Sequence, residues 1–293
     1  DRDRRPGRFL LLGSASFDLI RDASETLAGR IAIEELTGLR LDEVDRHASI
    51  TEHWLRGGFP DALLAPDDDL SLLWRENLIR TYVERDVPSY GVQAGPALLR
   101  RLLTMVAHLS GQQLNVQSLS NSLQLNGRTV EKYLSLLEQT FTVRRLPAYH
   151  TNVGKRLIKT PKIYLRDTGL LHTLLNLPTH QALSKHPVFG ASFESYVVEQ
   201  VFSHSLTERT DLYYYRTTNG AEMDLVLVKA GEISALVEIK TSPQPKLSKG
   251  FHISRNDLGK PPTYIVTPND VPAYALEEKI QVIGPRDIKR IFQ

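Results

Sequence analysis

Three charged side chains in an otherwise apolar stretch could together bind a metal ion: Asp224, Glu238 and Lys240. Two runs rich in Val, Ile and Leu, residues 222–228 and 233–240, flank Lys-Ala-Gly-Glu, which predicts two antiparallel strands. Side chains alternate along a strand, so Glu238 and Lys240 share a face. Two carboxylates suit a hard cation such as Mg²⁺ or Mn²⁺, and a lysine can steady charge on a phosphate. The alternative is three solvated charges on an edge hairpin.

The loop length of this hairpin decides whether Asp224 joins the other two. A two-residue loop at Ala230-Gly231 would pair Asp224 with Val237, on the face opposite Glu238. A loop of three or five residues would pair Asp224 with Glu238, because a one-residue slip exchanges the faces of a strand. We therefore expect an odd loop if a metal site exists.

A further carboxylate, Glu194, lies upstream in a predicted helix at residues 192–206. It shares the spacing i, i+3, i+4, i+7 with Val197, Val198 and Val201, so it occupies the apolar stripe. In one interpretation Glu194 faces the hairpin as a fourth member of the site. In the other it lies in the first turn after a Ser192 cap and only complements the helix dipole.

The elements around the hairpin have a recognisable order. We expect helix 192–206, strands 212–217, 221–228 and 233–240, helix 246–258 and strand 263–267. This αβββαβ order, with Asp224 separated by thirteen residues from Glu238-Ile239-Lys240, resembles the PD-(D/E)XK nuclease superfamily. The resemblance implies a restriction-endonuclease-like fold and Mg²⁺- or Mn²⁺-dependent phosphodiester cleavage. It makes Asp224, Glu238, Lys240 and Glu194 the candidate catalytic residues, with Asp224 and Glu238 as metal ligands. Met223 stands where many members have Pro.

Composition sets broad limits on the other regions. The chain has 293 residues, which suggests two or three domains, and its 41% hydrophobic and 24% charged residues are ordinary for a soluble globular protein. Together with the element order above, this predicts a multidomain α/β protein. The net charge of +2 gives no overall attraction to nucleic acid, so any such surface is local. Cysteine is absent, which fits a cytoplasmic protein, and no apolar run is long enough for a membrane span.

The first ninety residues resemble the end of an ATPase core. An apolar run at residues 9–12 predicts a buried strand, although no strand-forming partner precedes it, and the chain lacks an initiator Met, so we expect a fragment. Gly-Ser-x-Ser, Leu-Ala-Gly-Arg and LIRTYVERDVP resemble the end of the core and the lid of a prokaryotic AAA+ ATPase family. The resemblance implies that Ser14 senses the γ-phosphate and that Arg30 acts as an arginine finger, the alternative being a surface ion pair. No G-x-x-x-x-G-K-[ST] occurs, so ATP is expected only in the full-length protein.

Residues 96–166 predict a winged helix-turn-helix. Helices at 96–109, 116–123 and 128–139 precede two strands within 141–149 and 162–167. In DNA-binding relatives the third helix enters the major groove, and the wing contacts phosphate. The candidate nucleic-acid-binding residues are Arg128, Lys132, Arg144, Arg145, Lys155 and Arg156. A solvated loop or a protein-docking module is the alternative.

The whole chain resembles the C-terminal portion of a prokaryotic AAA+ family ATP-binding protein with a DUF4143 region. We predict three domains, at residues 1–92 (end of ATPase core and helical lid), 93–166 (winged helix) and 167–293 (nuclease-like). The resemblance implies a cytoplasmic protein, nucleic acid as partner, no membrane contact and a homo-oligomer formed through the ATPase part. Two functions stay open: a metal-dependent nuclease, or a non-catalytic regulatory or protein-interaction module with a degenerate nuclease fold.

Overall fold

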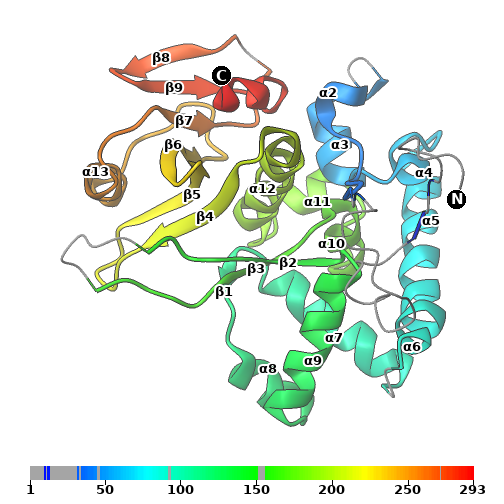
Figure 1. Cartoon of the computed structure of the whole chain (residues 1–293). Coiled ribbons are helices and arrows are strands. Elements are labelled where there is room, and N and C mark those ends of the chain that lie inside the picture. Colours follow the sequence, from blue (N-terminus) through cyan, green and yellow to red (C-terminus); the bar gives the residue numbers. More distant parts are fainter. Residues whose placement is uncertain are drawn as a thin grey trace, which may run out of the picture.

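The computed structural model describes residues 34–44, 47–91, 94–150, 156–270 and 272–293, with residues 10, 12, 13 and 32. It is a mixed α/β protein in which a helical region lies beside a six-stranded sheet (Figure 1). No helix in the described part of the chain has the length and apolarity needed to cross a bilayer. In the predicted first strand, Leu10 and Leu12 are 84% and 85% exposed, so the prediction that they are buried is wrong.

Short helices form the first described region, as the periodicity of residues 39–90 predicts. They are α2 (Leu41–Val44), α3 (Ile50–Arg56), α4 (Pro60–Leu63), α5 (Asp68–Thr81), the π-helical turn η3 (Tyr82–Asp86) and α6 (Val87–Ser89). The Asp67 side chain accepts a hydrogen bond from the Leu70 amide and caps α5. Acidic capping residues are typical of helix starts, so the run of three aspartates at residues 67–69 predicts a helix start here, and this contact confirms it.

The buried face of α5 and η3 differs from the one that helical spacing predicts. That spacing predicts that Trp74, Leu78, Tyr82 and Val83 face inward, but only Val83 is buried and the other three are half-buried. A charged residue, Arg75, is fully buried on this face, together with Ile79. The Arg75 guanidinium donates to the Gly169 carbonyl at 2.8 Å, so backbone oxygen replaces the water it loses.

Three helices and a small antiparallel sheet follow. The helices are α7 (Pro96–His108), α8 (Val116–Leu123) and α9 (Gly127–Gln139), within a residue of the predicted bounds. The strands are β1 (Gln112–Gln113), β2 (Val143–Leu146) and β3 (Lys162–Leu165), in the order β1-β3-β2. Asn115 and Asn126 cap α8 and α9, which explains why the sequence locates both starts well.

The helices α10 (Thr168–Leu174) and α11 (His180–Ser184) lead to the large sheet. α10 packs against α3, α5 and α7, and a Cβ on Gly169 would lie 2.0 Å from the Arg56 carbonyl oxygen. Trp54 of α3 donates from Nε1 to Ser192 of the next long helix at 2.8 Å. One hydrophobic core therefore joins the helical region to the long helix and one face of the sheet.

The last region has the predicted αβββαβ order, followed by elements that were not predicted. It contains α12 (Phe189–Glu208), β4 (Asp211–Arg216), β5 (Glu222–Lys229), β6 (Glu232–Ile239), α13 (Lys249–Asp257), β7 (Thr263–Val266), β8 (Tyr274–Glu277), β9 (Ile280–Ile283) and the 3₁₀ helix η4 (Pro285–Phe292). The sheet order is β4-β5-β6-β7-β9-β8. β4, β5 and β6 pair antiparallel, whereas β6, β7 and β9 are parallel.

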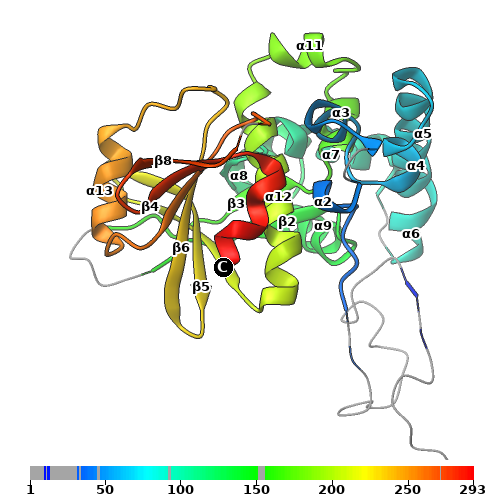
Figure 2. The same cartoon turned by 90° about the horizontal axis from the view of Figure 1, so that it is seen from above.

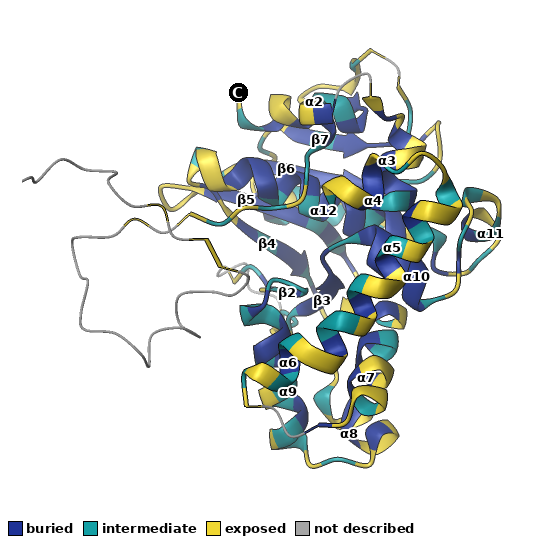
Figure 3. Cartoon of the chain, turned by 90° about the vertical axis from the view of Figure 1, so that its right-hand side faces the viewer, coloured by how far each residue is buried: buried dark blue, intermediate teal, exposed yellow. Residues whose placement is uncertain are grey.

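The two faces of this sheet bury different residues. Leu225, Leu227 and Val237 share the large core with α12, whereas Val226 and Leu236 pack with α13. This alternation places the two helices on opposite sides of the sheet, as Figures 1 and 2 show. Figure 3 shows that buried residues are concentrated in the sheet and in α12.

Candidate active site

A β-bulge sets the register of the hairpin that carries the three predicted charges. The loop has only two residues, Ala230-Gly231, both with positive φ, between paired Lys229 and Glu232. Such a loop alone would turn Asp224 away from Glu238. The ladder, however, skips Ser234: Val228 pairs with Ile233, and Leu227 pairs with Ala235.

The bulge changes the parity of the hairpin. From Leu227 onward the paired register runs to Leu225 opposite Val237, and its continuation by one residue would put Asp224 opposite Glu238. The expectation that an odd loop is required was therefore wrong. One unpaired residue in β6 has the same effect as an odd loop.

The three hairpin charges are held by hydrogen bonds within the hairpin. The Asp224 Oδ2 atom accepts a hydrogen bond from the Ile239 amide at 2.8 Å. Lys240 Nζ donates to Glu238 Oε1 at 2.6 Å, as expected for side chains two residues apart on one face. The Glu238 side chain is 7% exposed, and that of Lys240 is 33% exposed.

Glu194 joins this group from α12. Together with Asp224 and Lys240 it lines a cavity of about 240 Å³. α12 begins at Phe189, so Glu194 lies beyond the first turn, and the Ser192 hydroxyl bonds to Trp54 and His172 instead of capping the helix. The interpretation of Glu194 as a first-turn acid after a Ser192 cap is therefore wrong.

Sequence reasoning missed three further members of this cluster: Lys162, Tyr164 and Glu222. Lys162 Nζ lies 2.8 Å from both Glu194 Oε1 and Glu222 Oε1, and 3.9 Å from Asp224 Oδ1. The Tyr164 hydroxyl donates to Glu194 Oε1 at 2.7 Å. Side chains two residues apart in a strand share a face, so Lys162 lies on the face of Tyr164 and Glu222 on the face of Asp224. This alternation could have indicated that Glu222 belongs to the site of Asp224.

Burial and crowding shift the acids and bases of the cluster. Burial raises the pKa of Asp224 well above its ordinary value, and the charges of Glu238 and Glu194 raise it further. Burial also raises the pKa of Glu238, against the effect of Lys240. For Lys162, burial would lower the pKa, but the surrounding carboxylates raise it above the ordinary value.

The charge balance of the cluster favours an additional cation. Four carboxylates, those of Glu194, Glu222, Asp224 and Glu238, surround two lysines, and Arg216 contacts Glu222 at 2.9 Å on the rim. Carboxylate oxygens are the ligands that Mg²⁺ and Mn²⁺ prefer. Within the described ranges no group of three or more acidic or histidine side chains forms a ready-made metal site. A cation in this cluster would therefore rest on two carboxylates, those of the predicted metal ligands Asp224 and Glu238.

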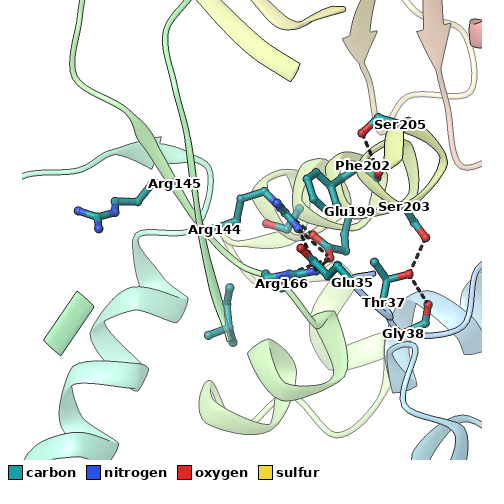
Figure 4. Close-up of polar contacts among 12 residues, drawn as sticks. Glu35, Thr37, Gly38, Arg144, Arg145, Arg166, Glu199, Phe202, Ser203 and Ser205 are labelled. Atoms are coloured by element: carbon teal, nitrogen blue, oxygen red, sulfur yellow. Dashed lines mark hydrogen bonds and ion pairs between the residues drawn. The ribbon is translucent and has the colours of Figure 1, made fainter. Parts of the chain in front are cut away.

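Two of the predicted nucleic-acid-binding residues are paired with acids of the protein itself. Arg144 forms a bidentate pair with Glu199, at 3.0 and 3.1 Å, and its guanidinium lies over the ring of Phe202 (Figure 4). Arg145 pairs with Glu131 and, at 2.6 Å, with Glu138. In the structure both guanidiniums form ion pairs with carboxylates of the same chain.

The remaining predicted residues fall into two groups. Arg128 and Lys132 of α9 and Arg156, which follows β2, are exposed. Ser14, Arg30 and Lys155 lie outside the described residues. Their predicted roles stay predictions.

Comparison with known proteins identifies two regions of the chain. Residues 189–286 carry the domain described as "Domain of unknown function (DUF4143)", and residues 47–181 match "Domain of unknown function (DUF8612)". The DUF4143 region is thus confirmed. The ATPase connection and the three domain boundaries stay predictions.

The relatives are longer than this chain. Uncharacterized proteins of Mycobacterium tuberculosis and Mycobacterium bovis are each 41% identical over 270 residues, which is 92% of this chain and 60% of each relative. An uncharacterized protein of Haemophilus influenzae is 28% identical over 126 residues, 41% of this chain and 31% of that protein. The chain thus spans 60% of the length of its mycobacterial relatives. No solved structure matches it significantly.

Proposed function

We propose that the cluster around Glu194, Asp224, Glu238 and Lys240 is the active site of a metal-dependent nuclease. The observation that carries this proposal is the common cavity lined by Glu194, Asp224 and Lys240, with Glu238 bonded to Lys240. These residues come from one helix and two strands, so their approach is a property of the fold. The αβββαβ order supports a restriction-endonuclease-like fold for this region.

The chemistry follows from the residue types. Asp224 and Glu238 would hold Mg²⁺ or Mn²⁺, which when bound polarises a phosphoryl oxygen and lowers the pKa of a water. Lys240, one third exposed, is free to reorient its ammonium from Glu238 towards a phosphate oxygen in the cavity. Glu194 is held in place by Lys162 and Tyr164, so it adds negative charge at a defined position.

We extend the proposal to nucleic acid as the substrate. Three helices followed by an antiparallel strand pair are the arrangement of a winged helix-turn-helix, in which α9 would contact DNA. The exposed Arg128, Lys132 and Arg156 are the cations suited to phosphate contact. In the whole protein, an ATP-binding region resembling an AAA+ core would couple nucleotide state and self-association to this site.

A second function is favoured by one specific observation. The acids already have protein cations as partners, with Lys162 between Glu194 and Glu222, and Lys240 on Glu238. A cluster neutralised in this way could serve a non-catalytic regulatory or protein-interaction module with a degenerate nuclease fold. In that case the chain would bind neither metal nor scissile phosphate.

The test is incubation of the purified chain with plasmid, linear duplex and single-stranded DNA in Mg²⁺ or Mn²⁺. Lys240→Ala should abolish cleavage, whereas Lys229→Ala, at the other end of the same hairpin, should leave it unchanged. Cleavage that is identical in both variants would locate the activity elsewhere, for instance in a contaminant. The lack of cleavage in any protein would favour the binding module.

A further inference from the structure

Lys162 comes from a different part of the chain than the carboxylates that surround it. It is the first residue of β3, within the region matched by DUF8612, whereas the carboxylates around it belong to the DUF4143 region. Both units therefore contribute charge to one site. The DUF4143 region alone does not contain the complete cluster.

Contacts on both sides hold Lys162 in place. Its side chain is 4% exposed, and the two strand residues that follow it, Ile163 and Tyr164, are buried. The segment before β3 runs along β4, with Leu157 bridged to Thr217 and the Tyr214 hydroxyl bonded to the Thr160 carbonyl. These contacts hold the backbone that carries Lys162 against the large sheet, with its ammonium directed into the cluster.

The ammonium occupies a position that would otherwise be open to another cation. Its Nζ atom is 2.8 Å from Glu194 and Glu222 and 3.9 Å from Asp224, so three carboxylates approach one point. Carboxylates held together this closely repel one another unless a positive charge lies between them. The Lys162 ammonium supplies this positive charge as a single charge, and because it is covalently attached to the chain it does not exchange with ions in solution.

We propose that Lys162 is a built-in competitor of divalent cations and limits the site to one metal ion. It holds Glu194 and Glu222, which leaves Asp224 and Glu238 for the metal. Lys162 is a positioning residue, because it acts through the carboxylates and not on the substrate. The proposal rests on the metal site proposed above, and it predicts what removal of the lysine would create.

The experiment is calorimetric titration of Mn²⁺ into the wild-type chain, Lys162→Met, Lys162→Arg and Lys159→Met. We expect one Mn²⁺ for the wild type and two for Lys162→Met, or one bound about tenfold or more tightly, because the competing charge is gone. Lys162→Arg keeps the charge and should behave as wild type. Lys159 is exposed three residues upstream, so Lys159→Met is the matched control.

The outcomes separate this proposal from the nuclease proposal. Mn²⁺ binding by Lys162→Met but not by the wild type would support the role of Lys162 and refute the native metal site. Equal or weaker binding in Lys162→Met than in the wild type would overturn the role of Lys162 and leave the metal site standing. The absence of binding in every protein would overturn both.

A second measurement covers the case in which Lys162→Met fails to fold. Its circular dichroism is recorded with EDTA and with excess Mn²⁺. Recovery of the wild-type spectrum on adding Mn²⁺ would show that a divalent cation replaces the ammonium. A spectrum that stays unfolded in Mn²⁺ would mean that Lys162 has a packing role only, and would contradict the proposal.

Discussion

Replacing Glu199 with Gln should be the most destabilising single charge change on α12. The Glu199 carboxylate accepts from Arg144 at 3.0 and 3.1 Å and from Arg166 at 2.8 and 2.6 Å (Figure 4). Burial would raise the pKa of Glu199, but the two guanidiniums lower it below its ordinary value, so the carboxylate is ionised. Glu35 is the other acid bonded to Arg166, at 2.5 Å.

The expected magnitude follows from how the charges are enclosed. The Arg144, Arg166 and Glu199 side chains are 13%, 8% and 17% exposed, so water cannot replace the lost partner. Removing one member of such a buried pair costs about 3–5 kcal/mol when a charge loses its close partner. Here Arg166 keeps Glu35, whereas Arg144 keeps only a carboxylate oxygen of Glu35 at 3.9 Å. We expect Glu199→Gln to lower the free energy of unfolding by that amount.

Urea unfolding followed by tryptophan fluorescence measures this loss, since Trp54 lies in the same core. Glu208→Gln is the control: Glu208 ends the same helix and pairs with Lys229 at 3.3 Å, with both side chains more than one third exposed. That change should cost under about 1 kcal/mol. A loss for Glu199→Gln no larger than the control would refute the argument that the network is sealed from water.

Three other predictions follow from buried or exposed charges. Burial lowers the pKa of His53 to about 4 and that of His172 to about 3, so both are neutral when folded but take up a proton when unfolded below pH 6.5. Stability is therefore lost as pH falls, by about 2 kcal/mol per histidine between pH 7 and 5, and urea titrations at the two pH values should show this. Asp224→Asn should abolish Mn²⁺ binding in calorimetry. It should leave the melting temperature unchanged or higher, because the raised pKa of Asp224 means that its negative charge opposes folding. A lower melting temperature would contradict this. Arg128→Ala and Lys132→Ala should each weaken duplex DNA binding and reduce its salt dependence by about one charge, whereas a reduced salt dependence in Arg144→Ala would contradict the internal role of that residue.

Local patterns predicted the elements because local physics determines them. The starts of α8 and α9 follow from Asn115 and Asn126, whose side chains cap the first turn of each helix. The helical spacing of apolar residues predicts how far each helix extends. The Val- and Leu-rich runs on either side of Ala230-Gly231 predicted β5 and β6 for the same reason. The strands β8 and β9 have only four residues each, and all four residues of β8 are exposed. The apolar alternation that predicts a strand is therefore too short or missing in this region.

Contacts between distant residues could not be predicted in the same way. Lys162 meets Glu194 across 32 positions of sequence, and in isolation a lysine after Thr-Pro is typical of a solvated loop. Arg144 was assigned to a phosphate-binding wing because nothing local indicates that Glu199 of α12 lies beside it. The bulge at Ser234 is invisible to a parity count, because the count assumes a regular ladder.

The two lysines of the cluster have different physical roles, and this difference connects the two proposed functions. Lys240 is one third exposed, so water can solvate its ammonium when it leaves Glu238. Lys162 is 4% exposed, so its removal from Glu194 would leave buried charges without compensation. The cluster thus combines one fixed cation with one exchangeable cation. The exchangeable cation, Lys240, lines the cavity, which is where a metal ion or a phosphate would arrive under the proposed nuclease function.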